Sequence, residues 1–173
     1  MSNEPQPDAL SVAEAIRRKR AVRAYTTAPV PEDVIEAILN AGRRAQSSKN
    51  TQPWAFVLVT EREQLARVAA AGTYAAHMAH AAFTVVLVAA PGSEFDLGQA
   101  AANMQLAATA LGVGSCVTIL HNEALAHEVL GVPSDLTCRW TITFGYPADA
   151  NAARPLAAGG RRPLSEVLHR ERY

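Results

Sequence analysis

The sequence predicts a domain of the α+β class, and three observations lead to that prediction. The chain has 173 residues, which is the usual size of one globular domain. Hydrophobic residues make up 49% of it and charged residues only 18%, which excludes an intrinsically disordered chain. Strand-like and helix-like segments are interspersed without a strict strand–helix–strand rhythm, which favours α+β over a doubly wound parallel sheet.

Charge and cysteine content narrow the classes of partner and compartment. The 16 Lys and Arg balance the 16 Asp and Glu, so a broad basic field for nucleic acid is not expected. Cys116 and Cys138 lie in apolar stretches and form no CxxC pair, which favours a reduced, cytoplasmic setting. Residues 1–10 contain acids and prolines but no apolar core, so we expect a flexible tail before a single domain over residues 11–173.

Four segments have the character of buried strands. Each is short and rich in β-branched or aromatic residues, and the second is closed by Pro91 and Gly92. The predicted strands are residues 54–60, 83–89, 116–120 and 137–146.

The predicted helices are marked by their caps. Ser11 and Glu14 fit a capping box, in which the Ser hydroxyl accepts from the backbone of Glu14 and the carboxylate reaches back. Asn122 precedes a short helix that should stop at Gly131. The helices are expected over residues 11–19, 31–45, 61–71, 74–80, 96–112, 122–131 and 164–169, the last as a helix or an arm.

A long uncharged segment covers residues 97–120. Its length would allow it to cross a bilayer, which takes about 20 predominantly apolar residues. Gln99, Asn103 and Gln105 make it polar in places, Gly112 interrupts it, and much of the rest is alanine. The central helix of a soluble core is therefore the favoured interpretation, and a membrane span is the alternative.

Basic residues are concentrated in two places. The first group is Arg17, Arg18, Lys19, Arg20 and Arg23, and the second is Arg161 and Arg162. Three interpretations are open: a solvated helix end that opposes the helix dipole, a phosphate site, or a nucleic-acid patch. The phosphate interpretation rests on the planar fork of donors that arginine offers to a dianion.

The polar loop over residues 47–54 (SSKNTQPW) runs from a predicted helix directly into a predicted strand. Because rigid elements flank it, its amides and hydroxyls are suited to recognise the edge of a planar ligand. The alternative is an ordinary turn in which Ser and Asn side chains bind their own backbone.

Other chemical signals are weak. His77 and His80 could share a metal ion, but no third ligand is evident, so we expect no metal site. Ser115 follows two glycines, yet Val117 replaces the second glycine of a GxSxG elbow. There is no P-loop and no GxGxxG motif. We therefore name no catalytic side chain and expect a carried cofactor.

Seven motifs follow one another over nearly the whole chain. They are residues 16–25 (IRRKRAVRAY), 47–54 (SSKNTQPW), 96–98 (DLG), 103–108 (NMQLAA), 111–116 (LGVGSC), 145–147 (GYP) and 161–167 (RRPLSEV). In this order they resemble the FMN-dependent nitroreductase family. The chain looks like a compact member, because few residues separate the strand that begins at Phe83 from the helix near Asp96.

The resemblance implies an intertwined homodimer with an α+β sandwich fold. A central, mainly antiparallel sheet would be flanked by helices, and FMN would bind without a covalent bond at the subunit interface. The uncharged helix would then be the central packing and dimer helix. The resemblance assigns three groups of residues to FMN. They are Lys19, Arg20, Ala21, Arg23, Arg161 and Arg162 for the phosphate side; Ser47, Ser48 and Asn50 for the ribityl chain or ring; and Thr118, Ile119 and Leu120 for the ring near N5.

The implied function is hydride transfer from NADH or NADPH, through FMN, to a small acceptor such as a nitroaromatic or a quinone. Two alternatives from other classes remain open. One is a flavin- or deazaflavin-binding dimer without turnover of its own. The other is a nucleic-acid module that uses residues 17–23. Neither nucleic acid nor a membrane is the expected partner.

Overall fold

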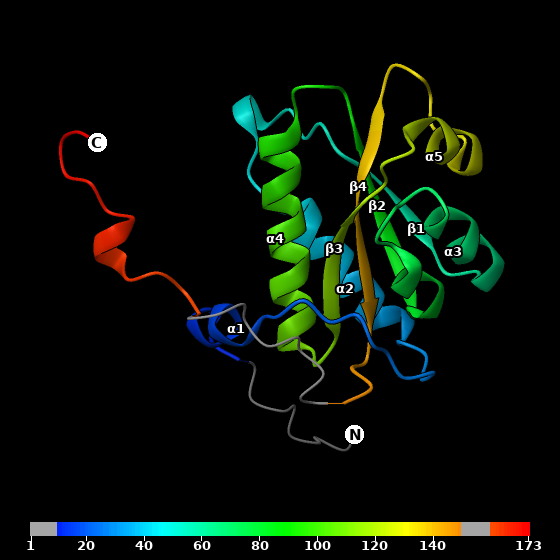
Figure 1. Ribbon diagram of the computed structural model, residues 1–173, viewed down its shortest axis with the longest axis horizontal. Coiled ribbons are helices and arrows are strands. Elements are labelled where there is room, and N and C mark those ends of the chain that lie inside the picture. Colours follow the sequence, from blue (N-terminus) through cyan, green and yellow to red (C-terminus); the bar gives the residue numbers. More distant parts are fainter. Residues whose placement is uncertain (1–9, 150–159) are drawn as a thin grey trace, which may run out of the picture.

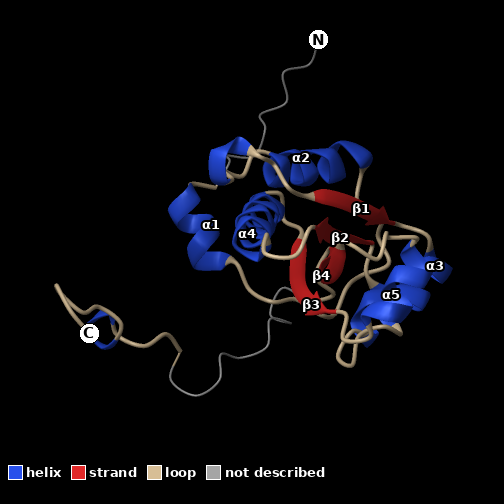
Figure 2. Cartoon of the chain, turned by 90° about the horizontal axis from the view of Figure 1, so that it is seen from above, coloured by secondary structure: helices blue, strands red, loops and turns tan. Residues whose placement is uncertain are grey.

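The computed structural model describes residues 10–149 and 160–173 and has three layers (Figure 1). The predicted tail over residues 1–10 therefore falls almost entirely outside the described part of the chain. Two helices cover one face of a central sheet, and shorter helices cover the other face (Figure 2). This arrangement confirms the α+β class that the sequence predicts.

The sheet has four strands in the order β1-β2-β4-β3, and every neighbouring pair is antiparallel. The strands are β1 (Ala55–Val59), β2 (Phe83–Ala89), β3 (Gly114–Ile119) and β4 (Thr137–Gly145). All four predicted strands are present, and β3 begins two residues before the predicted start. Strands β1 and β3 form the two edges of the sheet.

One face of the sheet packs against α2 (Glu32–Arg43) and α4 (Glu94–Ala110). Phe83 and Phe144 stack there with ring centroids 4.8 Å apart. The other face packs against α3 (Arg62–Ala69), the 3₁₀ helix η2 (Ala76–His80) and α5 (Glu123–Leu130). Strand β2 is buried along its whole length because it is central and covered on both faces. This explains its nearly continuous apolar sequence, which only Thr84 interrupts.

Helix α4 explains the uncharged segment. It packs against α1 (Val12–Arg18), α2 and β3, so several of its sides face protein rather than water. A Cβ at Gly42 of α2 would lie 2.2 Å from Met104 Cε, so a larger residue there would force the Met104 side chain to move. No helix in the described ranges is long and apolar enough to span a membrane.

The predicted capping box is half right. The Ser11 hydroxyl accepts a hydrogen bond from the Glu14 backbone N–H at 3.2 Å, as predicted. The Glu14 carboxylate does not reach back, and it instead pairs with Arg17 and Arg18. Residues three and four positions apart lie on one helix face, so these two cations compete successfully for the carboxylate.

Two predicted helices take other forms. Residues 74–80 contain the 3₁₀ helix η2, and residues 164–169 contain only the 3₁₀ turn η3 (Leu164–Glu166), with η1 (Ser48–Asn50) as a further 3₁₀ turn. The C-terminal segment, residues 160–173, extends away from the rest of the chain, and all of its residues are exposed (Figure 1). At α5 the prediction is correct, since the Asn122 side chain accepts from the Leu125 N–H at 3.1 Å and Gly131 has φ +64°.

Candidate functional site

The segment that follows α1 docks onto the outer edge of β3. Ala21 forms a parallel bridge with Ser115, and the Val22 N–H donates to the Ser115 carbonyl at 2.9 Å. Four residues further along, Tyr25 forms an antiparallel bridge with Pro147. The basic segment is therefore fixed to the sheet at both of its ends.

Beyond Ser115 the outer edge of β3 is open. The Leu120 N–H donates to the Arg139 carbonyl of β4, whereas the Ser115 carbonyl points the other way. Backbone groups alternate in direction along a strand, so the N–H and C=O of Val117 and Ile119 also point away from β4. No described strand pairs with them. They offer a short row of donors and acceptors to a ligand.

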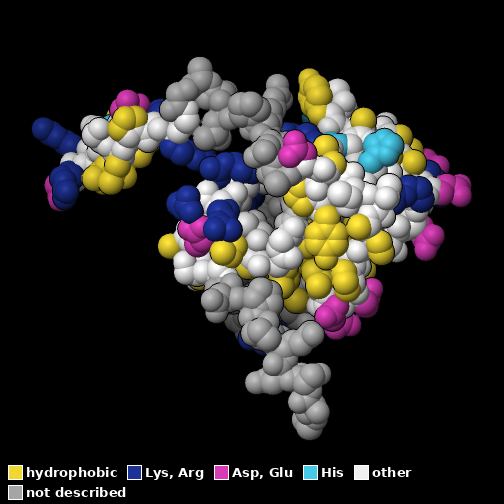
Figure 3. Space-filling model, turned by 90° about the horizontal axis from the view of Figure 1, so that it is seen from below, with side chains coloured by type: hydrophobic (Ala, Val, Ile, Leu, Met, Phe, Trp, Pro, Cys, Tyr) yellow, Lys and Arg dark blue, Asp and Glu magenta, His cyan; other side chains and the backbone are white. Residues whose placement is uncertain are grey.

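Three cationic side chains lie near this edge. Lys19 is half-buried, and burial is the main cause that lowers the pKa of its ammonium group. Arg161 contributes to the same lowering through like-charge repulsion, so the start of the C-terminal segment lies near Lys19. Arg23 acts on the Cys116 thiol of β3, where burial raises the pKa and the arginine opposes that rise. Figure 3 shows Lys and Arg side chains gathered at this end of the molecule.

The other arginines of the segment serve the helix end. Arg17 and Arg18 form ion pairs with Glu14. Arg20 donates to the carbonyls of Arg17 and Lys19 at 2.7 and 2.8 Å. The helix-end interpretation therefore fits these three side chains, whereas it does not fit Arg23.

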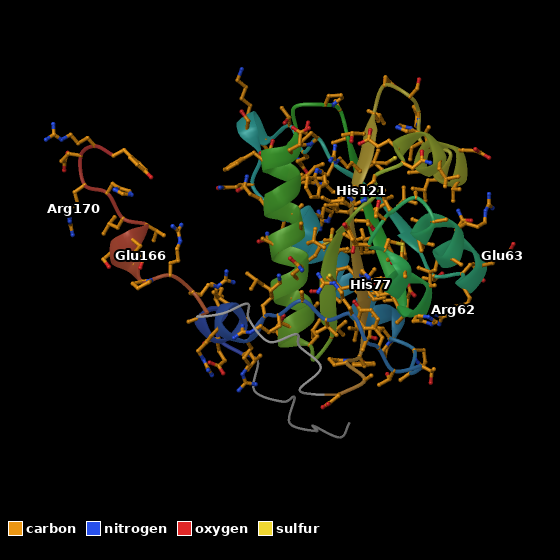
Figure 4. All side chains as sticks on the ribbon, in the orientation of Figure 1. Arg62, Glu63, His77, His121, Glu166 and Arg170 are labelled. Carbon is orange, nitrogen blue, oxygen red and sulfur yellow. The ribbon has the colours of Figure 1, made fainter. Side chains whose placement is uncertain are left out.

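A histidine that the sequence did not assign to the site lies against β3 (Figure 4). The His77 Nε2 is 3.2 Å from the Thr118 hydroxyl. Burial, followed by the charge of Arg23, lowers the pKa of His77 below its ordinary value. The alternation of side chains along a strand places Thr118 on the face of the sheet where η2 packs. In the sequence, this alternation is the only indication that Thr118 and His77 could be in contact. No cluster of metal ligands is found among the described residues.

The polar loop lies elsewhere. The 3₁₀ turn η1, cyan in Figure 1, is at the level of the first turns of α4, whereas the basic segment is at the end of β3 that follows the last turn of α4. The backbone is left-handed at Lys49, Asn50 and Gln52, with φ between 48° and 55°. Such strain, at about 1–3 kcal/mol per residue, is concentrated at functional sites in proteins.

Within the loop the side chains differ. The Ser47 hydroxyl accepts from the Gln52 N–H at 2.9 Å, so it maintains the turn. Ser48 and Asn50 are exposed, and their side chains bind no other described residue. One chain thus brings the predicted residues of the basic segment and of β3 together, but it does not bring Ser48 and Asn50 to them.

Comparison with known proteins identifies the family. Residues 16–146 match the model of the nitroreductase family. The chain belongs to the nitroreductase family. A protein of Archaeoglobus fulgidus, provisionally named an NADH dehydrogenase/NAD(P)H nitroreductase, is 32% identical over 170 residues, which cover 91% of this chain and 96% of that protein. The resemblance found in the motifs is confirmed, and the chain is a nitroreductase-like oxidoreductase.

Two further relatives carry flavin in their names. The NADPH-flavin oxidoreductase of Vibrio harveyi is 26% identical over 181 residues, covering 92% of this chain and 73% of that protein. The solved structure of the NADPH:FMN oxidoreductase from Vibrio harveyi with NAD⁺ superposes with a TM-score of 0.83 at 25% identity, covering 94% and 77% of the two chains. Family membership together with these relatives supports FMN and NAD(P)H as the cofactors of this nitroreductase.

Proposed function

We propose that this nitroreductase transfers hydride from NADH or NADPH, through FMN, to a small acceptor such as a nitroaromatic or a quinone. The observation that carries the proposal is the open edge of β3, which is bordered by cations at one end. The residues proposed to bind FMN are Lys19, Arg20, Ala21, Arg23, Ser47, Ser48, Asn50, Thr118, Ile119, Leu120, Arg161 and Arg162.

The donors along this edge fit the two ends of FMN. Lys19 and Arg161 lie close enough to repel one another, and a phosphate dianion between them would relieve that repulsion. Further along the same edge, the outward N–H of Ile119 is suited to a ring nitrogen of the flavin. Leu120 is fully buried and its N–H is already bound to Arg139, so we assign Leu120 a positioning role.

Bound FMN supplies the acceptance and release of electrons. The protein residues would hold and orient it, and the cations beside β3 would favour the negative charge that develops on reduction. No side chain in this proposal forms a covalent bond with substrate. That agrees with the absence of a nucleophile motif in the sequence.

We further propose that the site is completed by a second copy of the chain. Helix α4 has 17 residues and is therefore about 25 Å long, and η1 and the basic segment lie toward its opposite ends (Figure 1). This separation favours contact of Ser48 and Asn50 with a ligand held by Arg23 of the other copy. A two-fold symmetric pair would bring the loop of one copy to the basic segment of the other.

The surface beside β3 also supports a dimer. A cavity of about 340 Å³ lies between α4 and the sheet and is largely apolar, with Trp140 and Val117 in its wall. Val117 is 39% exposed and Phe95, near the start of α4, is 80% exposed. Apolar surface of this kind on a single chain is typical of an interface.

The purified protein tests the proposal directly. We expect it to show the absorption spectrum of a flavin or to acquire it when FMN is added, and to oxidise NADH or NADPH when a quinone or nitroaromatic is present. A colourless protein that cannot be reconstituted with FMN would overturn the proposed function. Flavin binding without turnover for any acceptor would favour a binding protein instead.

A further inference from the structure

We propose that His77 takes up a proton at Nε2 when the flavin held beside it is reduced. His77 lies against Thr118, one residue from the outward N–H of Ile119, and next to Arg23. The inference rests on the proposed function, since it needs a flavin at the open edge of β3. It concerns a group that exchanges protons with the site and makes no covalent bond.

Hydrogen bonds hold the imidazole in one orientation while they leave its protonation free. The ring is hydrogen-bonded to the backbone of Tyr74 in its own segment. Its Nε2 faces the Thr118 hydroxyl at 3.2 Å, and a hydroxyl can both donate and accept. With neutral His77 the hydroxyl donates to Nε2, and with protonated His77 it rotates and accepts from Nε2–H. The pair therefore suits both protonation states without movement of the backbone.

The charges around His77 keep it neutral before reduction. Partial burial disfavours the charged imidazole, and Arg23, from the segment after α1, acts in the same direction because it disfavours a second positive charge nearby. The nearest titratable group on β3 is the Cys116 thiol, which is hydrogen-bonded to Thr118 and remains protonated because burial raises its pKa. On the segment after β3, His121 accepts from the Thr73 N–H at 3.2 Å and packs edge-on against Tyr74. No described carboxylate forms an ion pair with His77.

Reduction reverses this balance. FMN that gains two electrons and one proton gains one unit of negative charge, and a negative charge nearby favours the protonated imidazole. The second proton comes from solvent and stays on Nε2, so reduction consumes two electrons and two protons in all. The pKa of His77 is thus low in the oxidised protein and raised in the reduced protein. Between those two pKa values the additional proton is taken up.

The experiment measures the two-electron midpoint potential of the FMN-loaded protein as a function of pH. In the wild-type protein we expect the slope to double, from one proton to two per electron pair, over the pH range between the two pKa values. One proton per two electrons corresponds to about 30 mV per pH unit. In His77→Gln, which keeps a hydrogen-bonding side chain but cannot titrate, the slope should stay at one proton over that range.

Two control variants define the origin of the effect. His80→Gln changes an exposed histidine at the end of the same 3₁₀ helix and should retain the wild-type slope. Thr118→Val removes the hydroxyl that pairs with Nε2 in both protonation states, so it should shift the pH range in which the slope is doubled without abolishing the doubling. A doubled slope that persists unchanged in His77→Gln would overturn the inference, because the proton would then reside on the flavin itself.

A second measurement does not depend on turnover. Histidine NMR of the protein without flavin should give a His77 pKa below its ordinary value, and reduction of the FMN-loaded protein should raise the His77 pKa. If FMN binds but the His77 pKa is the same in the oxidised and reduced states, this inference fails while the proposed function stands. If FMN does not bind at all, both fail.

Discussion

Two groups of residues that were predicted to bind one ligand lie toward opposite ends of helix α4. The two segments that contain them differ in how they are held. The basic segment is fixed to the sheet, since Ala21 bridges Ser115 and Tyr25 bridges Pro147. The loop with Ser48 and Asn50 is exposed and is held by its own turn hydrogen bonds and a left-handed backbone. The difference teaches that a single chain contains two unlike halves of the proposed site: a basic half that is fixed to the sheet and a loop half that is exposed.

The largest effect is expected at the basic end. Arg23→Ala and Arg161→Ala should each weaken FMN binding by about 1.5–3 kcal/mol, the contribution of a hydrogen bond to a charged group, which is roughly 10- to 150-fold in Kd. Fluorescence titration of the flavin-free protein measures this. Arg43→Ala is the matched control, because Arg43 is exposed on α2 and binds Asn40. Equal FMN affinity in all three variants would contradict the placement of the phosphate.

A smaller effect is expected when a hydrogen bond that holds the basic segment in place is removed. The Tyr25 hydroxyl is 2.6 Å from the Val22 carbonyl and 2.7 Å from the Thr143 hydroxyl. Tyr25→Phe should lower the free energy of unfolding by about 1–3 kcal/mol, because it leaves polar groups unsatisfied in a mostly buried place. Urea unfolding checks the value, and FMN affinity should fall with it. A stability equal to that of the wild type would show that the segment is held without this hydroxyl.

In the exposed loop, a side chain can be removed without loss of stability. Asn50→Gly removes the side-chain amide while glycine accepts the φ of 55°, so it should weaken FMN binding by about 0.5–1.5 kcal/mol without loss of stability. Lys49→Gly is its control, since it relieves similar strain at φ 52° and removes no proposed contact. Isothermal calorimetry compares the two. If Lys49→Gly weakened binding as much as Asn50→Gly, the loop conformation rather than the amide would be responsible.

The smallest effect concerns the helix that precedes the basic segment. Arg17 and Arg18 lower the pKa of Glu14 from 4.5 to about 2. A carboxyl whose pKa is lowered by folding contributes stability above its ordinary pKa and loses it as the pH falls toward about 2. The Tm difference between wild type and Glu14→Gln should therefore be small at neutral pH, because the pair is exposed to solvent, and should vanish on acidification. A difference that did not change with pH would contradict the pairing.

Much of the fold could be predicted because it depends on local signals. The apolar run of β2 and the Asn122 cap of α5 both appear where the sequence places them. The predicted hydrogen bond from the Ser11 backbone N–H to the Glu14 carboxylate was wrong. The capping pattern does not show that two arginines on the same helix face compete for that carboxylate. Spacing alone therefore does not decide whether the Glu14 carboxylate binds the backbone N–H of Ser11 or the neighbouring arginines.

The site was harder to predict than the fold. Arg23 and Ile119 are assigned to the site by motif resemblance, yet the approach of the basic segment to β3 depends on the docking of one segment onto the strand edge. His77 and Thr118 are 41 residues apart in the chain, and their contact exists only through the packing of η2 on the sheet. Such a tertiary contact has no periodic pattern in the sequence, so a histidine judged structural becomes a candidate for proton uptake.

The measurement that tests the central claim most directly mixes two defective copies. Arg23→Ala damages the basic half, and the double variant Ser48→Ala with Asn50→Gly damages the loop half. If each site combines the basic segment of one copy with the loop of the other, dimers that contain one chain of each kind have one intact site. We predict that such mixed dimers, purified through two different tags, bind one FMN per dimer with wild-type affinity. Affinity no better than that of the two parent variants would show that each chain builds its site alone.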